Sequence, residues 1–184
     1  ALAPAALVYR GGLALRDGTS RIEVPVLPVV SVGNLTVGGT GKTPIAAWIV
    51  GELRVLGAKP AVIMRGYAGG DEIAVHRRLN PGIPVIGDAD RVAGVVRAKA
   101  RGANVAVLDD AFQHRRIARV SDIVLVSADA WNGEVRLLPA GPWREPLSAL
   151  RRASVVVVTR KAVDESRADA VTRALGVSLS LIHI

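Results

Sequence analysis

The stretch Val29–Pro44, which reads VVSVGNLTVGGTGKTP, decides the fold of this chain. It begins as an apolar run, turns at Gly33-Asn34 and passes through three closely spaced glycines to Lys42 and Thr43. Apolar residues then recur with helical spacing over 45–56. A strand, a glycine-rich loop, a Lys-Thr pair and a helix, in this order, predict a phosphate-binding loop.

The chemistry of such a loop gives each part a role. Glycines let backbone N–H groups surround phosphate oxygens, and the helix N-terminus adds partial positive charge. We expect Lys42 to reach the β- and γ-phosphates as a catalytic group, and the Thr43 hydroxyl to bind Mg²⁺. The predicted nucleotide-binding residues are Thr36, Val37, Gly38, Gly39, Thr40, Gly41, Lys42 and Thr43. Thr36 stands where the common pattern has its first glycine, and the alternative is a glycine-rich turn followed by Lys-Thr by chance.

Composition narrows the class of protein. A length of 184 residues suits one domain, and half of the residues are apolar with few aromatics, as in α/β proteins with buried parallel strands. The net charge of +8, which comes mostly from arginine, indicates an anionic partner such as a nucleotide, a nucleic acid or a membrane surface. Nucleic-acid binding is not expected, because the sequence shows neither aromatic platforms nor a known module.

The two ends of the chain differ from the middle. Residues 1–20 form an apolar segment, for which a short helix on a membrane surface and a helix packed on the protein's own core are equally good interpretations. We expect a phosphate-loop domain over 21–177. The last seven residues, SLSLIHI at 178–184, follow no strand or cap pattern and are expected to be a non-native tail.

A second buried strand, Pro60–Met64, runs into glycines and then acids. Ligand groups gather at this end of strands in open α/β sheets. Asp71 is therefore a candidate catalytic base, with capping of the helix that follows as the alternative. His76, on the same helix, is expected at the surface.

A further apolar strand, Asn104–Leu108, ends directly in Asp109-Asp110. A carboxylate at a strand end, downstream of a phosphate loop, is placed to hold Mg²⁺ or its water. Neighbouring residues of a continuing strand point to opposite sides, so the two acids are expected to have different roles.

The remaining chain repeats a strand-then-helix rhythm. This rhythm predicts an α/β fold, a mostly parallel sheet with helices on both faces as in phosphate-loop NTPases. The additional strands are expected at Pro84–Ile86, Asp122–Val126 and Ser154–Thr159, and the additional helices at Asp88–Gly102 and Asp164–Leu175.

Five blocks in a fixed order resemble the tetraacyldisaccharide 4′-kinase family, the lipid A 4′-kinases. They are SVGNLTVGGTGKTP, RGY with GDE, DADR, LDDAFQHRR and RLLPAGPWREPL, and the resemblance covers about Leu2 to Thr159. The family also has a threonine at the position of Thr36. The resemblance implies ATP-dependent phosphorylation of the 4′-hydroxyl of a lipid A disaccharide precursor. It places the enzyme at the cytoplasmic face of the bacterial inner membrane.

The resemblance also implies roles for single residues. Asp71 would help to deprotonate the acceptor hydroxyl, and Asp109 and Asp110 would serve the metal and catalysis, with Glu145 as a further metal-side acid. Arg91 and Arg144 would stabilise charge in catalysis, as would His114 and Arg115. The chain departs from the family in a shortened segment before Asp71, in Ile73 and in Ala111. It also stops before the family's second lobe, so the resemblance implies that this part binds nucleotide better than it catalyses.

Two alternatives stay open at the level of the sequence. One is a phosphate-loop ATPase or GTPase that acts as a switch, although no guanine-reading NKxD motif is present. The other is a basic module that binds phosphate or a membrane surface without kinase activity.

Overall fold

The computed structural model describes residues 2–19, 22–66 and 71–176, which form two compact units. Unit 1 comprises Ala1–Arg21, Asn34–Gly41 and Val124–Ile184, and unit 2 comprises Ile22–Gly33 and Lys42–Ile123. The helices are α1 (Ala3–Thr19), α2 (Lys42–Val55), α3 (Asp71–Leu79), α4 (Arg91–Ala100), the short 3₁₀ helix η1 (Leu147–Arg152) and α5 (Glu165–Leu175). The strands are β1 (Val29–Asn34), β2 (Pro60–Met64), β3 (Val85–Gly87), β4 (Val105–Asp109), β5 (Ser121–Ser127) and β6 (Val155–Thr159). The predicted domain limits stay a prediction.

The strands form a parallel sheet in the order β3-β2-β4-β1-β5-β6, which confirms the predicted α/β fold. Within unit 2, Val29 of β1 is in register with Ala106 of β4, and Val62 of β2 is in register with Val85 of β3. Because the strands are parallel, β1, β2 and β4 end at one edge. The residues that follow these strands therefore lie near that edge.

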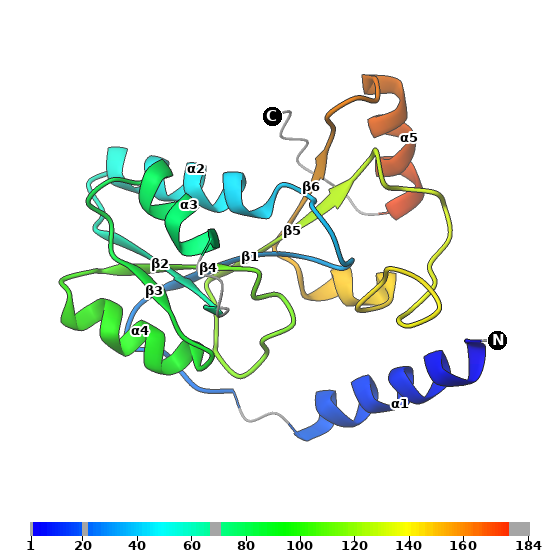
Figure 1. The fold of residues 1–184 in the computed structure, drawn as a ribbon, viewed down its shortest axis with the longest axis horizontal. Coiled ribbons are helices and arrows are strands. Elements are labelled where there is room, and N and C mark those ends of the chain that lie inside the picture. Colours follow the sequence, from blue (N-terminus) through cyan, green and yellow to red (C-terminus); the bar gives the residue numbers. More distant parts are fainter. Residues whose placement is uncertain (1, 20–21, 67–70, 177–184) are drawn as a thin grey trace. The chain divides into compact units, whose positions relative to one another are not determined.

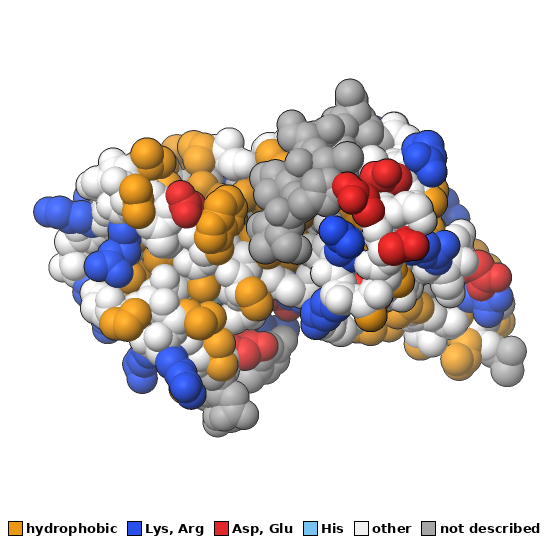
Figure 2. Space-filling view, turned by 90° about the horizontal axis from the view of Figure 1, so that it is seen from above, with side chains coloured by type: hydrophobic (Ala, Val, Ile, Leu, Met, Phe, Trp, Pro, Cys, Tyr) orange, Lys and Arg blue, Asp and Glu red, His pale blue; other side chains and the backbone are white. Residues whose placement is uncertain are grey.

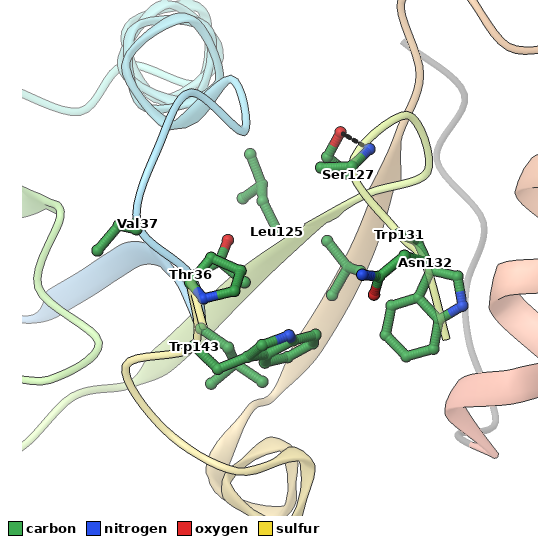
Figure 3. A pocket seen from close by; sticks show the side chains of 11 residues that line it. Thr36, Val37, Leu125, Ser127, Trp131, Asn132 and Trp143 are labelled. Carbon is green, nitrogen blue, oxygen red and sulfur yellow. Dashed lines mark hydrogen bonds between the residues drawn. The ribbon is translucent and has the colours of Figure 1, made fainter. Parts of the chain in front are cut away.

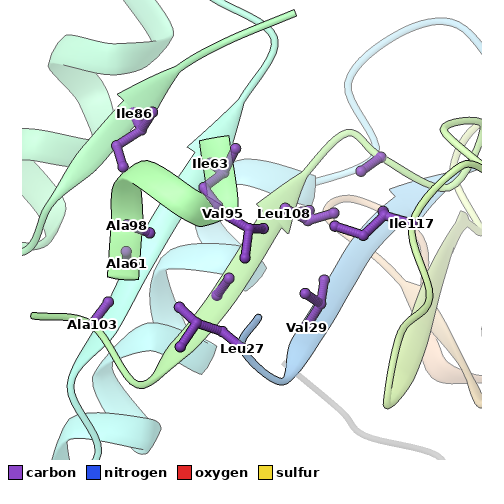
Figure 4. Packing of buried hydrophobic residues seen from close by; sticks show 12 residues of the cluster. Leu27, Val29, Ala61, Ile63, Ile86, Val95, Ala98, Ala103, Leu108 and Ile117 are labelled. Carbon is purple, nitrogen blue, oxygen red and sulfur yellow. The ribbon is translucent and has the colours of Figure 1, made fainter. Parts of the chain in front are cut away.

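Helices cover both faces of the sheet in unit 2. In Figure 1, α2 and α3 lie on one side of β2 and β4, and α4 lies on the other. The strands are apolar on both sides for this reason: every residue of β2 and β4 is buried. Figure 4 shows one half of this core, where Val95 and Ala98 of α4 pack with residues of the strands.

The bounds of α4 are set by its caps. The predicted helix began at Asp88, but Asp90 instead takes the N-cap position, where its carboxylate accepts hydrogen bonds from the backbone N–H groups of Val92 (2.9 Å) and Ala93 (3.3 Å). These two donors would otherwise have no partner at the helix start. The helix therefore begins at Arg91, three residues later than predicted.

Unit 1 contains β6, η1, α5 and the N-terminal helix α1. Asp129 ties the segment after β6 in place, because its carboxylate accepts hydrogen bonds from the backbone N–H groups of Lys161, Ala162 and Val163. The Tyr9 hydroxyl of α1 donates to the backbone oxygen of Arg144 at 3.0 Å.

The apolar side chains of α1 are largely open to solvent. Leu7, Val8 and Leu15 are 69%, 77% and 74% exposed. Which of the two interpretations of residues 1–20 holds stays a prediction. No helix among the described residues combines the length and the apolar character that crossing a bilayer requires.

Candidate active site at the phosphate loop

The loop between β1 and α2 has the backbone of a phosphate-binding loop. Gly38 has φ 108° and Gly41 has φ 85°, a region that residues with a side chain rarely adopt. Two hydrogen bonds within unit 1 fix the loop: Val37 N–H donates to the backbone oxygen of Pro142 (2.8 Å), and the Thr159 hydroxyl donates to the backbone oxygen of Thr40 (3.1 Å). These two bonds hold the backbone of the loop in place, and residues 37–39 are exposed.

Lys42 and Thr43 begin α2, directly after the loop. The Lys42 ammonium lies 3.8 Å from Asp110 Oδ1, and its side chain is only 12% exposed. The Thr43 hydroxyl donates to Asp109 Oδ2 at 2.9 Å. The two residues predicted to contact phosphate and metal are thus each paired with one of the two predicted acids.

Asp109 and Asp110 occupy different environments, and their separate roles stay a prediction. Asp109 is the last residue of β4 and is buried, whereas the Asp110 side chain is 35% exposed. Asp110 has φ 51°, a left-handed conformation that is uncommon for a residue with a side chain. This turn ends the alternation of the strand and directs Asp110 towards Lys42.

The prediction that His76 lies at the surface is wrong. His76 is fully buried, and its Nε2 lies 2.9 Å from Asp109 Oδ2. The signal was present in the sequence, because Ile73, His76 and Asn80 recur at helical spacing and form the less exposed face of this segment.

The Asp109 carboxylate fits one side of a Mg²⁺ site. Its Oδ1 is buried and has no hydrogen-bond partner among the described residues, while Oδ2 accepts from Thr43 and His76. Within the part of the chain that the structure describes, no group of three or more His, Cys, Asp or Glu side chains could hold a metal. Mg²⁺ does not need such a group, because it is commonly bound by one or two carboxylates together with water and substrate phosphates.

Two other predicted catalytic residues lie at helix starts in unit 2. Asp71 is the first residue of α3, and its side chain lies outside the described part of the structure. Arg91 is the first residue of α4 and is 3% exposed, and its Nη1 donates to the backbone oxygen of Asp88 at 2.6 Å. Burial and the nearby positive charges of Arg91 and Arg119 lower the pKa of His114, which favours a neutral imidazole.

Arg144 and Glu145 belong to unit 1. The Arg144 N–H donates to the backbone oxygen of Leu35 at 2.7 Å, just before the loop. Glu145 is buried and forms an ion pair with Arg152 at 2.6 Å. The catalytic role of Arg144 and the metal-side role of Glu145 stay predictions.

A small pocket with mostly apolar walls adjoins the first loop residues in unit 1. Thr36 and Val37 line it together with the indole rings of Trp131 and Trp143, which meet edge to face with centroids 5.8 Å apart (Figure 3). Trp143 Nε1 donates to the backbone oxygen of Glu134 at 3.0 Å, so the polar edge of its ring is satisfied. The sequence did not predict this pocket.

Comparison with known proteins identifies the family. The family model of tetraacyldisaccharide-1-P 4′-kinase matches residues 1–77 and 68–182. The tetraacyldisaccharide 4′-kinase of Halorhodospira halophila is 42% identical over 188 residues, which cover 90% of this chain and 57% of that protein. The enzyme of Chlorobium luteolum is 37% identical and is matched over 98% of this chain and 59% of its own length. The chain thus spans a little over half the length of these relatives.

Solved structures agree with this result. The structure of LpxK from Aquifex aeolicus, which was determined in complex with ATP, has a TM-score of 0.78 and 32% identity over 85% of this chain and 57% of its own. The hydrogenase maturation factor HypB from Archaeoglobus fulgidus has a TM-score of 0.57 at 13% identity, over 97% of this chain and 87% of its own, and shares the fold alone. From the matched residues and the extent of these similarities, the chain belongs to the tetraacyldisaccharide 4′-kinase family.

Proposed function

We propose that this chain supplies the nucleotide-binding part of a kinase that transfers the γ-phosphoryl group of ATP to the 4′-hydroxyl of a lipid A disaccharide precursor. The observation that carries the proposal is the hydrogen bond from Thr43, at the start of α2, to Asp109, at the end of β4. Phosphate-loop enzymes bind Mg²⁺ and nucleotide phosphates with three parts: the loop, the Lys-Thr pair that follows it, and a carboxylate at the end of a strand. Family membership and the ATP complex of the Aquifex aeolicus relative support ATP as the donor.

The loop residues have the first task, which is to bind the phosphates. The loop over 36–41 would surround phosphate oxygens, and the Lys42 ammonium would leave Asp110 to contact the β- and γ-phosphates. Thr43, Asp109 and Asp110 would hold Mg²⁺, which when bound offsets the negative charge on the phosphates. In phosphoryl transfer the protein acts mainly by positioning and by electrostatic stabilisation, and these are the means present here.

The acceptor hydroxyl requires a base. Asp71, at the N-terminus of α3, is the proposed base, because it matches the aspartate of the family's GDE block. Arg91 and Arg144 would stabilise developing charge, and Glu145 would support the metal side. General base catalysis contributes about 10²- to 10⁴-fold.

The acceptor is an acylated, anionic lipid, and the chain has features that suit a membrane surface. The exposed leucines and valines of α1 and the net charge of +8 support peripheral binding at the cytoplasmic face of the bacterial inner membrane. On the face that Figure 2 views, Lys and Arg side chains are dispersed among hydrophobic and neutral ones and form no continuous stripe.

The test compares two substitutions in the full-length protein, Lys42→Ala and Asp71→Asn, by measuring kcat and KM for phosphate transfer from ATP. Lys42→Ala should reduce kcat/KM more than Asp71→Asn. The alanine variant lacks the cation that contacts the phosphates, whereas the asparagine variant lacks only the base. Val75→Ala, an exposed position on α3, is the matched control and should retain wild-type kinetics. Transfer that survives Lys42→Ala unchanged would refute the proposal.

A further inference from the structure

His76 is the one charged or titratable side chain of α3 that is fully buried among those described for this helix. The other described side chains of α3 are exposed, apart from the partly buried Ile73. Burying an imidazole is unfavourable unless its polar atoms are hydrogen-bonded, and among the described residues Nε2 has a partner whereas Nδ1 is buried without one. The described partner of His76 is not a backbone oxygen of the core but Asp109, the carboxylate at the end of β4.

The contacts at Asp109 decide which atom donates. Asp109 Oδ2 already accepts the proton of the Thr43 hydroxyl at 2.9 Å, and an ionised carboxylate has no proton of its own to offer. The hydrogen bond of 2.9 Å between His76 and Asp109 therefore has Nε2–H as its donor. His76 and Thr43 thus both donate to the same oxygen, from α3 and α2 respectively.

Two donors on one oxygen fix the orientation of the carboxylate group. With Oδ2 held between α2 and α3, the other oxygen, Oδ1, stays buried and has no hydrogen-bond partner among the described residues. It is the oxygen left to bind a cation or the water on a cation. Groups that hold a metal ligand by hydrogen bonds in this way raise metal affinity, and their loss typically lowers it about 10- to 100-fold.

The same bond also links two parts of the site. His76 lies five positions after Asp71 on α3, which corresponds to about 7.5 Å along the helix axis. A helix this short has little stability of its own and is ordered by its contacts. A bond from its buried face to the end of β4 therefore orders the helix that begins with the proposed base.

We propose that His76 is a positioning residue of this kinase, which holds Asp109 so that Oδ1 faces the Mg²⁺–nucleotide and which anchors α3 at the metal side of the site. The inference rests on the proposed function, because it assigns a role within that site. It goes beyond it in naming a residue outside the phosphate loop and the paired acids. If the histidine only filled space in the core, its loss would reduce stability without changing the dependence of nucleotide binding on Mg²⁺.

The test uses His76→Gln, whose amide nitrogen can replace Nε2–H, and His76→Leu, which fills the space without a donor. A third variant, His76→Asn, has the same amide on a shorter side chain and keeps the test decisive if the leucine variant fails to fold. Val75→Ala, on the exposed side of α3, is the control. ATP binding to the full-length protein is measured by calorimetry across a Mg²⁺ titration, with and without chelator.

His76→Leu and His76→Asn should raise the Mg²⁺ concentration for half-maximal ATP binding by about 10-fold or more. His76→Gln should stay within about threefold of the wild type, and ATP binding in chelator should be unchanged in all variants. Equal Mg²⁺ dependence in all variants, or a glutamine variant as impaired as the leucine variant, would overturn the inference and leave the proposed function standing. If the wild type itself bound ATP without any dependence on Mg²⁺, this inference and the proposed function would both be wrong.

Discussion

Replacing Thr43 by valine should weaken both the fold and the Mg²⁺-dependent step, because one hydroxyl serves both. Valine keeps the β-branched shape and removes only the donor to Asp109 Oδ2, which lies 2.9 Å away. Hydrogen bonds to charged groups contribute about 1.5–3 kcal/mol to the free energy of unfolding. Thr43 is partly exposed, and in the valine variant His76 still donates to the same oxygen. We therefore expect the free energy of unfolding to fall by an amount near the lower end of this range, about 1.5 kcal/mol.

The effect on catalysis should be separate and at least as large. If the hydroxyl contributes the same about 1.5–3 kcal/mol to the bound metal and transition state, kcat/KM falls by about 10- to 150-fold. The assays are urea unfolding and initial rates of phosphate transfer from ATP at saturating Mg²⁺. Thr43→Ser, which keeps the hydroxyl, is the matched control and should retain most of the stability and most of the kcat/KM of the wild type. A valine variant with wild-type stability and rates would refute the assignment of this hydroxyl.

Two further substitutions test the scaffold of the site. Gly33→Ala places a Cβ 2.5 Å from Phe112 Cβ and 2.8 Å from Phe112 N, at the segment that follows the paired acids, so unfolding by urea should show a loss of about 1–3 kcal/mol or more. Asp90→Ala removes the N-cap of α4 and should cost about 1 kcal/mol at neutral pH, whereas Asp90→Asn should cost little. Hydrogen bonds from the backbone N–H groups of Ala93 and then Val92 hold the pKa of Asp90 below its ordinary value of 3.8. The charged carboxylate is thus favoured in the folded state, so its contribution is present above that value and is lost as the pH falls through the lowered pKa. The difference in stability between wild type and Asp90→Ala should therefore narrow in acid, and a difference that stayed constant would contradict the role of the charged cap.

The sequence was sufficient for the elements whose signal is local. The strand Pro60–Met64 was predicted with the observed bounds, since a continuous apolar run between a turn and glycines has few other solutions. The phosphate loop was predicted from glycines that need unusual backbone angles, and Gly38 and Gly41 have them. Thr43 and Asp109 were both assigned to a Mg²⁺ site from the general architecture of such loops, and the hydrogen bond between them is a finding of the structure.

The sequence was insufficient where a position depends on distant contacts. His76 was assigned to the surface because a lone histidine is usually exposed, yet its partner lies 33 positions away on another element. The pocket beside Thr36 needs Trp131 and Trp143, which meet only because two separate loops fold together within unit 1. The left-handed backbone of Asp110 likewise has no signature in the residue type alone.

The most direct test of the central claim is to incubate the full-length protein with ATP labelled in its γ-phosphate and a tetraacylated disaccharide 1-phosphate in mixed micelles with Mg²⁺. The account predicts that label enters the lipid at the 4′-hydroxyl, that transfer requires Mg²⁺, and that Lys42→Ala abolishes it. Label released only as inorganic phosphate, at a rate that is the same with and without the lipid, would contradict the account and indicate a nucleotide-hydrolysing switch.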